Sequence, residues 1–201
     1  EGLSEAVINV FVSLYENNLI YKGTRMVNWD TKLKSAVSDL EVTSSNELGK
    51  LWTIKYKAGD TFIEIATTRP ETLLGDTAVA VNPFDERYKE LIGQTVTIPI
   101  VNRDVEIIAD EYVDIDFGSG CVKITPAHDF NDYEIGKRHN LDLITCLDFD
   151  GNIEKKDFIP EELRGLDRFK ARERIVEMLE ENGILVSVED HQIQIPKGDR
   201  S

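Results

Sequence analysis

Residues 52–65, WTIKYKAGDTFIEI, contain the pattern that decides the fold. Every second residue from Trp52 to Tyr56 is apolar, and a second apolar run begins at Phe62, after Ala58-Gly59-Asp60. A period of two is typical of a strand with one buried face, and a short connection containing glycine is typical of a hairpin. The stretch therefore predicts two strands joined by a tight turn.

Further strands are predicted on both sides of this hairpin, each a short apolar run bounded by turn residues. They lie at 77–81, 96–101, 105–109, 121–124, 143–147, 185–188 and 192–195, with a turn at 102–104 between two of them. Val42–Glu47 is the most linker-like stretch, and it is predicted to be a loop inside the domain.

Helical periodicity predicts an amphipathic helix over residues 3–17, a second helix over about 129–139 and a third over about 168–182. The third is expected to turn Ile175, Val176 and Leu179 inward and to stop at Gly183. Many short strands and few helices, without regular alternation of the two, favour the α+β class. We expect a β-barrel-like core of short, mostly antiparallel strands, closed or nearly closed, with peripheral helices.

Composition places the chain among globular proteins. Its 201 residues suffice for one core, and 41% hydrophobic with 30% charged residues argues against disorder. No apolar run reaches the roughly 20 residues of a membrane helix, and the first residues do not form a targeting segment. Cys121 and Cys146 lack the spacing of a zinc or disulfide framework. A reducing, cytoplasmic location without membrane contact is expected.

The net charge of −15 is opposite to the basic footprint of most nucleic-acid-binding domains. Any contact with nucleic acid is therefore expected to be narrow, or to be made mainly by another part of a longer protein. Solubility alone is an equally good explanation of the acidity.

A polar turn, Thr67-Thr68-Arg69-Pro70-Glu71-Thr72, follows the hairpin. Pro70 lacks an N–H and disfavours helical geometry at Arg69, so the strand must end here. The turn presents hydroxyls and a guanidinium at one rim, which could hold a carbonyl, a ribose hydroxyl or a phosphate. The alternative is an ordinary polar turn with a solvated arginine, since threonine is common in turns.

A second polar cluster occupies residues 118–133, GSGCVKITPAHDFNDY. Lys123 and Thr125 are two apart on a strand, so they point to the same face. Asp129 and Asp132 are three apart in the first turn of the predicted helix, so their carboxylates lie on one side. These groups are expected to converge, with a histidine, near a strand-to-helix junction.

Each residue of this cluster also has a structural interpretation. Asp129 could be only an N-cap and Asp132 only a partner of the helix dipole. Lys123 could be a surface lysine, and His128 a structural residue before the cap. A metal site is disfavoured because His128 and Asp129 are sequence neighbours that do not converge well on one ion. No metal or cofactor is expected.

No activated nucleophile is visible in the sequence. Ser119 and Cys121 do not lie in a nucleophile-elbow pattern, and Cys121 is expected to be buried on a strand. The phosphate-binding patterns GxxxxGK(S/T) and GxGxxG do not occur either. If the chain is a hydrolase, water is expected to attack directly.

The two polar clusters together resemble the editing domain inserted in class I valyl-, isoleucyl- and leucyl-tRNA synthetases. Val27–Asp30, Ser38–Val42 and Tyr133–Leu141 are similar to the valyl branch. Leucyl enzymes usually carry Asp at the position of Glu71 and Met-Ala-Val at Lys123-Ile124-Thr125. Isoleucyl enzymes usually lack an arginine at the place of Arg69. Asp30-Thr31 departs from the family, which commonly has proline second, but this pair is expected to lie outside the pocket.

The resemblance implies hydrolysis of threonine wrongly attached to the tRNA for valine, after its transfer to the tRNA, with editing before transfer left open. It implies that water attacks the ester without a covalent enzyme intermediate. The implied catalytic residues are Thr72, Lys123, Asp129 and Asp132. The implied substrate-binding residues are Thr67, Thr68, Arg69, Thr72, Lys123, Thr125, His128, Asp129 and Asp132.

The resemblance also assigns roles. Asp132 would hold the α-ammonium group of the substrate, and Lys123, Thr125 and Asp129 would read its side chain and the terminal ribose. Arg69 and Thr72 would position the adenosine end and the attacking water. The implied partners are the 3′ end of the tRNA for valine and the remainder of a synthetase chain.

The synthetase signatures HIGH and KMSKS do not occur in the sequence, so no aminoacylation is expected from these residues. Residues 1–201 are expected to be one editing domain cut from a longer protein. Segments 1–45 and 185–201 would connect it to a catalytic core, to which the chain would return at Asp199-Arg200-Ser201. A leucyl-type editing domain and a non-catalytic tRNA-binding insertion remain the alternatives.

Overall fold

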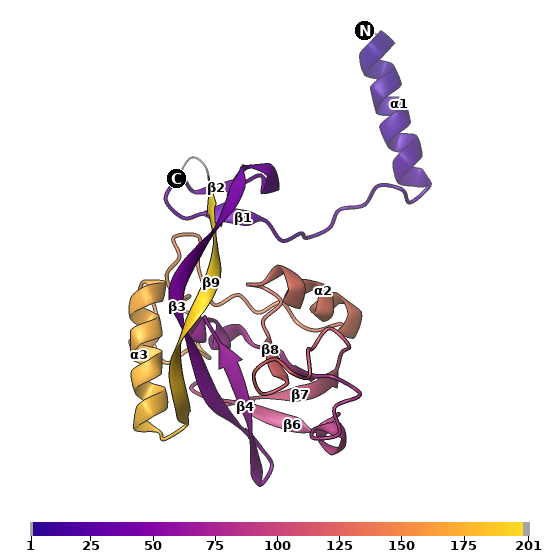
Figure 1. Cartoon of the computed structure of the whole chain (residues 1–201). Helices are drawn as coiled ribbons and strands as arrows, with labels where there is room; N and C mark the ends of the chain where they lie inside the picture. The colour runs from indigo at the N-terminus through magenta and orange to yellow at the C-terminus, as the bar shows by residue number, and fades with distance from the viewer. Residues whose placement is uncertain (1, 199–201) are drawn as a thin grey trace.

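A curled, seven-stranded sheet forms the body of the computed structural model, which describes residues 2–198 (Figure 1). Its strand order is β4-β3-β6-β7-β5-β8, and β9 pairs with β3 outside this path. The expected return point, Asp199-Arg200-Ser201, lies outside the described residues. The strands are β3 (Val42–Ala58), β4 (Thr61–Thr67), β5 (Ala78–Val81), β6 (Thr95–Ile98), β7 (Arg103–Ala109), β8 (Cys121–Ile124) and β9 (Leu185–Gly198).

The hairpin predicted from residues 52–65 is confirmed. β3 and β4 pair in antiparallel register from Trp52↔Thr67 to Ala58↔Thr61. Gly59 takes a positive φ of 58° in the turn between them, a conformation that glycine adopts without steric cost. Ile54 and Tyr56 are fully buried, so the alternation in the sequence marks the inner face of the sheet.

The sheet curls until its two edges approach each other. Ser119, just before β8, donates a hydrogen bond to the carbonyl of Glu64 in β4. All strand pairs are antiparallel except β5 with β7. The expected α+β fold with a barrel-like, mostly antiparallel core is thus confirmed as a half-barrel. Two of its strands are long rather than short, since β3 has 17 residues and β9 has 14.

β5 is buried on both faces because different helices cover the two sides of the sheet. Val79 and Val81 join the main core, whereas Ala78 and Ala80 join a smaller cluster with Ile135 of α2. The described helices are α1 (Gly2–Glu16), α2 (Phe130–His139) and α3 (Arg168–Glu181), and the short 3₁₀ helices are η1 (Asp39–Glu41), η2 (Pro70–Gly75), η3 (Lys89–Leu91) and η4 (Glu161–Leu163). These α-helices lie close to the predicted ranges.

α3 packs lengthwise beside β3 and β9 (Figure 1). Its Ile175 and Leu179 are fully buried, as predicted, while Val176 is half-buried. The helix ends before Gly183, which has a φ of 67°. This helix closes the main core on the side of the sheet away from α2.

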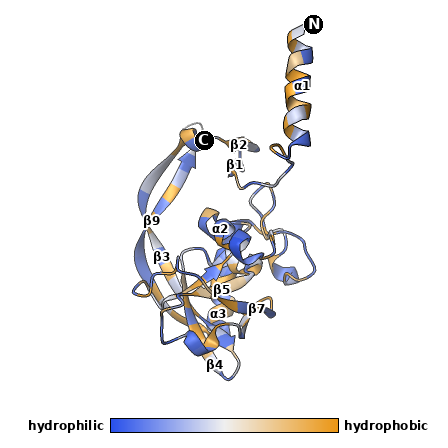
Figure 2. Cartoon of the chain, turned by 90° about the vertical axis from the view of Figure 1, so that its right-hand side faces the viewer, coloured by the Kyte–Doolittle hydropathy of each residue, from blue (hydrophilic) through white to orange (hydrophobic). Residues whose placement is uncertain are grey.

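The N-terminal helix α1 stands away from the body (Figure 1). None of its residues is buried, and apolar residues are spread along it (Figure 2). An extended segment then leads to a small hairpin of β1 (Asn28–Asp30) and β2 (Ser35–Val37). Trp29 of this hairpin donates a hydrogen bond to the carbonyl of Phe149, 2.8 Å away, which ties the hairpin to the body.

The predicted loop at Val42–Glu47 is wrong, because these residues begin β3 and pair with β9 from Val42↔Gly198 to Glu47↔Ile193. The separate strands predicted at 185–188 and 192–195 are parts of this one β9. The sequence here lacks the apolar alternation that indicates a strand. The reason is that β3 and β9 leave the body as a two-stranded ribbon with solvent on both faces.

The predicted strand at 143–147 is wrong as well. Side chains satisfy part of its backbone, because Cys146 N–H donates to the ring of His128 and Lys156 donates to the carbonyl of Thr145. The predicted turn at 102–104 lies too late in the chain. The turn occupies 99–102, with positive φ at Ile100 and Asn102, and Arg103 already begins β7.

Candidate active site

A cavity of about 250 Å³ lies where β4 ends in η2, beside the junction of β8 and α2. All the substrate-binding residues that the sequence predicted line it, so both polar clusters meet in one place. These residues are Thr67, Thr68, Arg69, Thr72, Lys123, Thr125, His128, Asp129 and Asp132. The remaining wall is made by Leu51, Ala66, Tyr112, Phe117, Val122, Asn131 and His191.

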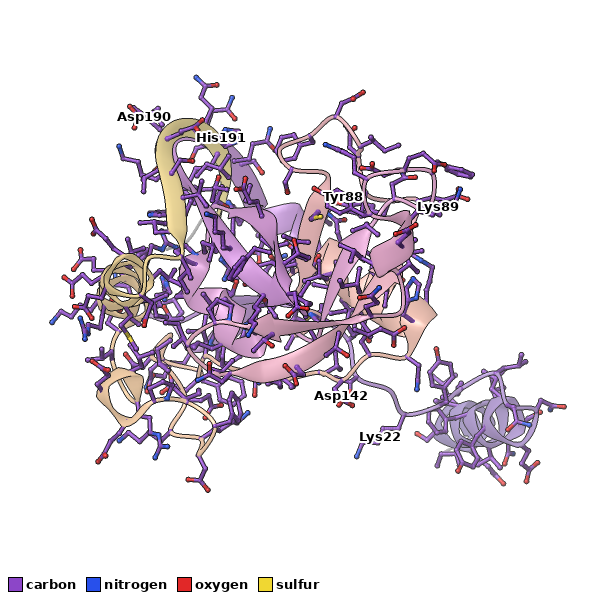
Figure 3. The ribbon with its side chains drawn as sticks, turned by 90° about the horizontal axis from the view of Figure 1, so that it is seen from below. Lys22, Tyr88, Lys89, Asp142, Asp190 and His191 are labelled. Atoms are coloured by element: carbon purple, nitrogen blue, oxygen red, sulfur yellow. The ribbon has the colours of Figure 1, made fainter. Side chains whose placement is uncertain are left out.

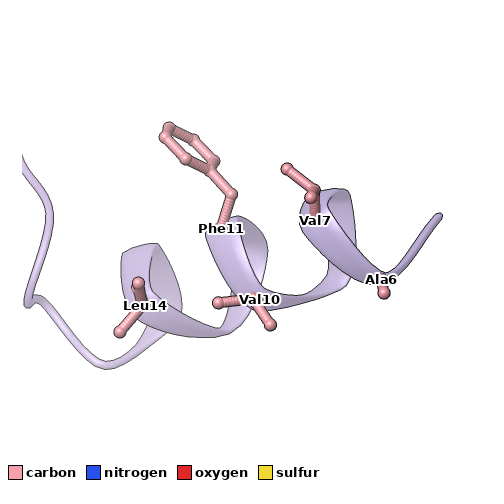
Figure 4. Close-up of a pocket in the computed structure, with 5 residues that line it drawn as sticks. All are labelled: Ala6, Val7, Val10, Phe11 and Leu14. Carbon is pink, nitrogen blue, oxygen red and sulfur yellow. The ribbon is translucent and has the colours of Figure 1, made fainter. Parts of the chain in front are cut away.

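A hollow of about 350 Å³ on α1 is a different kind of surface. Its lining residues are Ala6, Val7, Val10, Phe11 and Leu14, drawn in Figure 4. They belong to a single helix and carry no ionisable side chain. We therefore place the candidate site at the polar cavity.

Lys123 is buried, with 8% of its surface exposed, so it is not an ordinary surface lysine. Its ammonium nitrogen lies 2.9 Å from Thr72 Oγ1, 2.6 Å from Thr125 Oγ1 and 3.2 Å from Asp76 Oδ1. β8 supplies the lysine and η2 the threonine at 72. A buried ammonium requires such a set of acceptors, since an unpaired charge in the interior is very costly.

Asp76 is the counter-charge of Lys123, and it was not predicted from the sequence. It is fully buried at the end of η2 and accepts hydrogen bonds from Thr125 Oγ1 at 2.6 Å and from the Tyr56 hydroxyl at 2.9 Å. Burial raises the pKa of Asp76, while Lys123 and the two hydroxyl donors act in the opposite direction. Asp76 lies two residues after Leu74 and belongs to no recognisable sequence motif. Only the structure reveals its contact with Lys123.

Asp129 and Asp132 occupy different positions at the start of α2. Asp129 is its N-cap, with a side-chain oxygen 2.8 Å from Asn131 N and 3.2 Å from Asp132 N. Asp132 is buried, and its Oδ2 accepts from Thr125 N at 2.8 Å. Burial raises the pKa of Asp132 to about 6 against the influence of Lys123. Both carboxylates face the cavity.

His128 lies in the cavity wall as a neutral group. Its Nε2 accepts a hydrogen bond from Cys146 N at 2.9 Å, which places the ring proton on Nδ1. Burial, together with the positive charges of Arg69 and Lys123, lowers its pKa to about 4. Its carbonyl oxygen accepts a hydrogen bond from Arg69 Nη1 at 2.9 Å, so this residue also orients the arginine.

An ion pair between Glu71 and Arg172 anchors the polar turn to α3. This pair was not predicted from the sequence. Glu71 is 1% exposed and receives two hydrogen bonds of 2.8 Å from Arg172 of α3. Arg172 also lies 5.7 Å from the ring centre of Trp52. This arginine is distant in sequence, and its position on the partly buried side of α3 was the only available signal.

One side of the cavity is aromatic. Phe117 and His191 line it and lie edge to face, with ring centres 6.4 Å apart. Figure 3 shows His191 on β9, next to Asp190. Neither residue was predicted from the sequence to belong to the site, because they come from distant segments without a motif. A flat, partly apolar wall of this kind can receive a ring from a ligand.

Neither cysteine is activated. Burial raises the pKa of Cys121 to about 11 and that of Cys146 to about 12, so both remain thiols at neutral pH. Among residues 2–198, no three His, Cys, Asp or Glu residues are grouped as metal ligands. Within the same range, no helix has the length and apolar character needed to cross a membrane.

The family model for tRNA synthetases class I (I, L, M and V) matches residues 1–178. The chain belongs to this family. Over its full length it is 57% identical to the valine--tRNA ligase of Legionella pneumophila strain Lens and 56% identical to that of strain Paris. It spans 22% of each of these relatives, or about a fifth of their length.

Solved structures share the fold. The ternary complex of Agrobacterium radiobacter K84 agnB2 LeuRS with tRNA and LeuAMS matches with a TM-score of 0.51 and 18% identity, over 92% of this chain and 31% of that one. GlLeuRS-CP1 matches with a TM-score of 0.55 and 12% identity, over 70% of this chain and 100% of that one. The half-barrel and its helices are therefore the fold of a CP1 domain, as the resemblance in the sequence implied.

Proposed function

We propose that this chain edits threonyl-tRNA for valine by hydrolysing its ester bond, as part of a valyl-tRNA synthetase. One observation carries the proposal. A single cavity of about 250 Å³ brings together buried Lys123, Thr72 and Thr125 with the carboxylate of Asp132. Its size is below the usual range for drug-like ligands, which suits a small substrate. The identity with valine--tRNA ligases supports the choice of tRNA.

Threonine and valine differ little in shape, which is why an editing site is needed. An apolar synthetic pocket rejects the added hydroxyl of threonine by only about a hundredfold. A polar site can make the opposite selection, because valine would leave its buried groups without hydrogen-bond partners. The cluster around Lys123 provides such groups, and its residues line the cavity with little exposure.

The carboxylate of Asp132 suits the α-ammonium group of the ester. It is buried and already fixed by its hydrogen bond from Thr125 N, so it needs little reorganisation to accept a charged donor. Asp129 lies one turn of α2 earlier and faces the same cavity, where it would bind the ribose hydroxyls. Lys123 and Thr125 are left to read the side chain.

Arg69 and the threonines of the turn form the entrance for the tRNA end. The Arg69 side chain is 43% exposed, and one of its nitrogens is anchored on the carbonyl of His128. It would attract the phosphate of the terminal adenosine. Thr67, Thr68 and Thr72 line the same rim, and Thr72 would help to place the attacking water.

We infer that water attacks the ester directly. Both thiols have raised pKa values, and Ser119 is committed to the carbonyl of Glu64. The neutral ring of His128 has its Nε2 occupied by Cys146 N–H. An aminoacyl ester is already reactive, so orientation and electrostatic stabilisation can carry the reaction without a strong base.

The identity with valine--tRNA ligases also supports a domain organisation, which we propose here. Segments 1–45 and 185–201 would connect the half-barrel to the remainder of a cytoplasmic synthetase. α1 stands apart from the body (Figure 1), whereas β9 contributes His191 to the cavity wall.

The test is deacylation by the full-length protein that carries this sequence. Threonyl- and valyl-tRNA for valine are incubated separately, and the loss of each ester is followed above its spontaneous hydrolysis. The threonyl ester should be lost selectively. Equal rates for the two esters, or tRNA binding without hydrolysis, would contradict the proposed function, and the second result would favour a non-catalytic insertion.

A further inference from the structure

Asp76 lies directly behind the cavity and does not line it. The carboxylate is fully buried and has two faces. Oδ2 accepts from the Tyr56 hydroxyl at 2.9 Å, and Oδ1 accepts from Thr125 Oγ1 at 2.6 Å and from Lys123 Nζ at 3.2 Å. The side of Asp76 that points to the cavity therefore receives hydrogen bonds from two residues of its wall.

The ammonium group of Lys123 donates all three of its N–H protons to acceptors within the protein. An ammonium group has three N–H donors and no acceptor. They meet Thr72 Oγ1 at 2.9 Å, Thr125 Oγ1 at 2.6 Å and Asp76 Oδ1 at 3.2 Å. The lysine therefore reaches a ligand through the hydroxyl groups that it holds, and it offers no further proton to the cavity.

The two threonine hydroxyls are oriented by the same set of contacts. Each hydroxyl has one proton and two lone pairs. Thr72 gives its proton to the carbonyl of Arg69 at 2.9 Å, and Thr125 gives its proton to Asp76. Each then accepts one proton from Lys123. What remains on each oxygen is one lone pair, and both residues line the cavity.

We propose that Asp76 is a positioning residue that sets the hydrogen-bond polarity of the cavity, so that the site selects a substrate side chain able to donate a hydrogen bond. The inference rests on the proposed editing function and specifies how that function recognises threonine. The threonyl hydroxyl donates to the free lone pair of Thr125. A valyl methyl group leaves that buried acceptor unpaired, and so does any group that can only accept.

The sharpest probe is an ester whose side chain resembles threonine in size but cannot donate. We choose the threonine analogue in which fluorine replaces the side-chain hydroxyl, attached chemically to the tRNA for valine. The full-length protein is given the threonyl, fluoro and valyl esters, and each kcat/KM is divided by the rate of spontaneous hydrolysis. This division removes the activating effect of fluorine on the ester.

The fluoro ester should be cleaved roughly ten- to a hundredfold less efficiently than the threonyl ester, at a level similar to the valyl ester, since one buried acceptor stays unpaired. Equal cleavage of the fluoro and threonyl esters would overturn the polarity proposal and leave the editing function intact. Failure to cleave the threonyl ester would instead overturn the editing function. The two failures are therefore distinguishable.

Variants of Asp76 test its positioning role separately from the comparison of the three esters. Asp76→Ala frees the hydroxyl of Thr125 and one proton of Lys123, so the ratio of threonyl to fluoro cleavage should fall toward one. Asp76→Asn keeps an oxygen acceptor toward both groups and should largely restore the ratio. Tyr56→Phe removes only the contact at the far oxygen and serves as the control for lost stability.

An unchanged ratio in folded Asp76→Ala would overturn the role of Asp76. A ratio that falls equally in Tyr56→Phe would also overturn it, because any loosening of the core would then have the same effect. If Asp76→Ala does not fold, the comparison of the three esters with the unaltered protein still decides the polarity.

Discussion

Arg172 of α3 holds both carboxylate oxygens of Glu71, with Nε and Nη2 each 2.8 Å from an oxygen. Glu71 stands between Arg69 and Thr72, two residues that line the cavity. The ion pair therefore fastens the polar turn to a helix on the other side of the core.

Arg172→Ala should destabilise the protein by about 3 kcal/mol, because it leaves the buried carboxylate of Glu71 with only the more distant Arg69, whose Nε lies 3.8 Å away. Chemical denaturation measures the loss. Arg174→Ala is the matched control, since Arg174 lies on the same helix but pairs with exposed glutamates, and it should cost less than about 1 kcal/mol. Equal losses in the two variants would show that the Glu71 pair has no special structural role.

Deacylation should increase with pH through about 6. Burial raises the pKa of Asp132 to about 6, and only its ionised form can hold an ammonium group. The measurement is the rate of enzymatic deacylation between about pH 5 and 8, after subtraction of spontaneous hydrolysis. In Asp132→Asn the rate should be low and the rise should disappear. A rise that persists in this variant would assign it to another group.

The same shift has a consequence for stability. The folded state binds the Asp132 proton more tightly than the unfolded state, where the pKa is 3.8. Asp132 therefore reduces stability as the pH rises from about 4 to about 6, and the reduction is complete above that range. Asp132→Asn should accordingly be more stable than the unaltered protein at pH 7, by about 2 kcal/mol. A less stable variant would contradict this sign.

Asp129 combines a structural role with a proposed contact to the ribose, and two substitutions separate them. Asp129→Ala should cost about 1 kcal/mol, because it removes the cap of α2. Asp129→Asn should keep the cap, since Asn is an equally good N-cap, and yet lower deacylation roughly tenfold through the weaker neutral hydrogen bond. Full activity in Asp129→Asn would reduce Asp129 to a capping residue.

His128 should be neutral and protonated on Nδ1 at pH 7. Burial lowers its pKa to about 4, and its Nε2 accepts from Cys146 N. Nitrogen chemical shifts of the imidazole ring report both the tautomer and the titration. Because the unfolded pKa is 6.5, this residue should cost stability as the pH falls from about 6.5 to about 4. A ring that titrates near 6.5 in the folded protein would refute the assignment.

The sequence predicts elements with a clear period or a clear stop. The hairpin at 52–65 alternates, β8 lies between glycine and proline, and α2 begins at an aspartate that caps it. Prediction from the sequence fails where solvent covers both faces of a strand, as in the ribbon at Val42–Glu47. It also fails where side chains replace the backbone partners of a strand, as at Cys146.

The candidate site, too, was only partly predictable from the sequence. Its polar lining residues in the two compact motifs next to strand ends were predictable, whereas Phe117 and His191 on the aromatic side were not. The supporting residues were not, since Tyr56, Asp76 and Arg172 are separated in sequence from one another and reach the site only through the curl of the sheet and the packing of α3. An isolated aspartate, tyrosine or arginine gives no signal of this kind.

The exposed helix α1 has a thermodynamic consequence. Its 15 residues have no buried contact, and helices of about 12–15 residues are only marginally stable in water on their own. Leu3, Val7 and Phe11 are more than half exposed. By itself the helix of residues 2–16 is therefore only marginally stable, and a surface that covered these apolar side chains would stabilise it. Any such surface must first supply the free energy of ordering the segment, and its measured affinity will be lower by that amount.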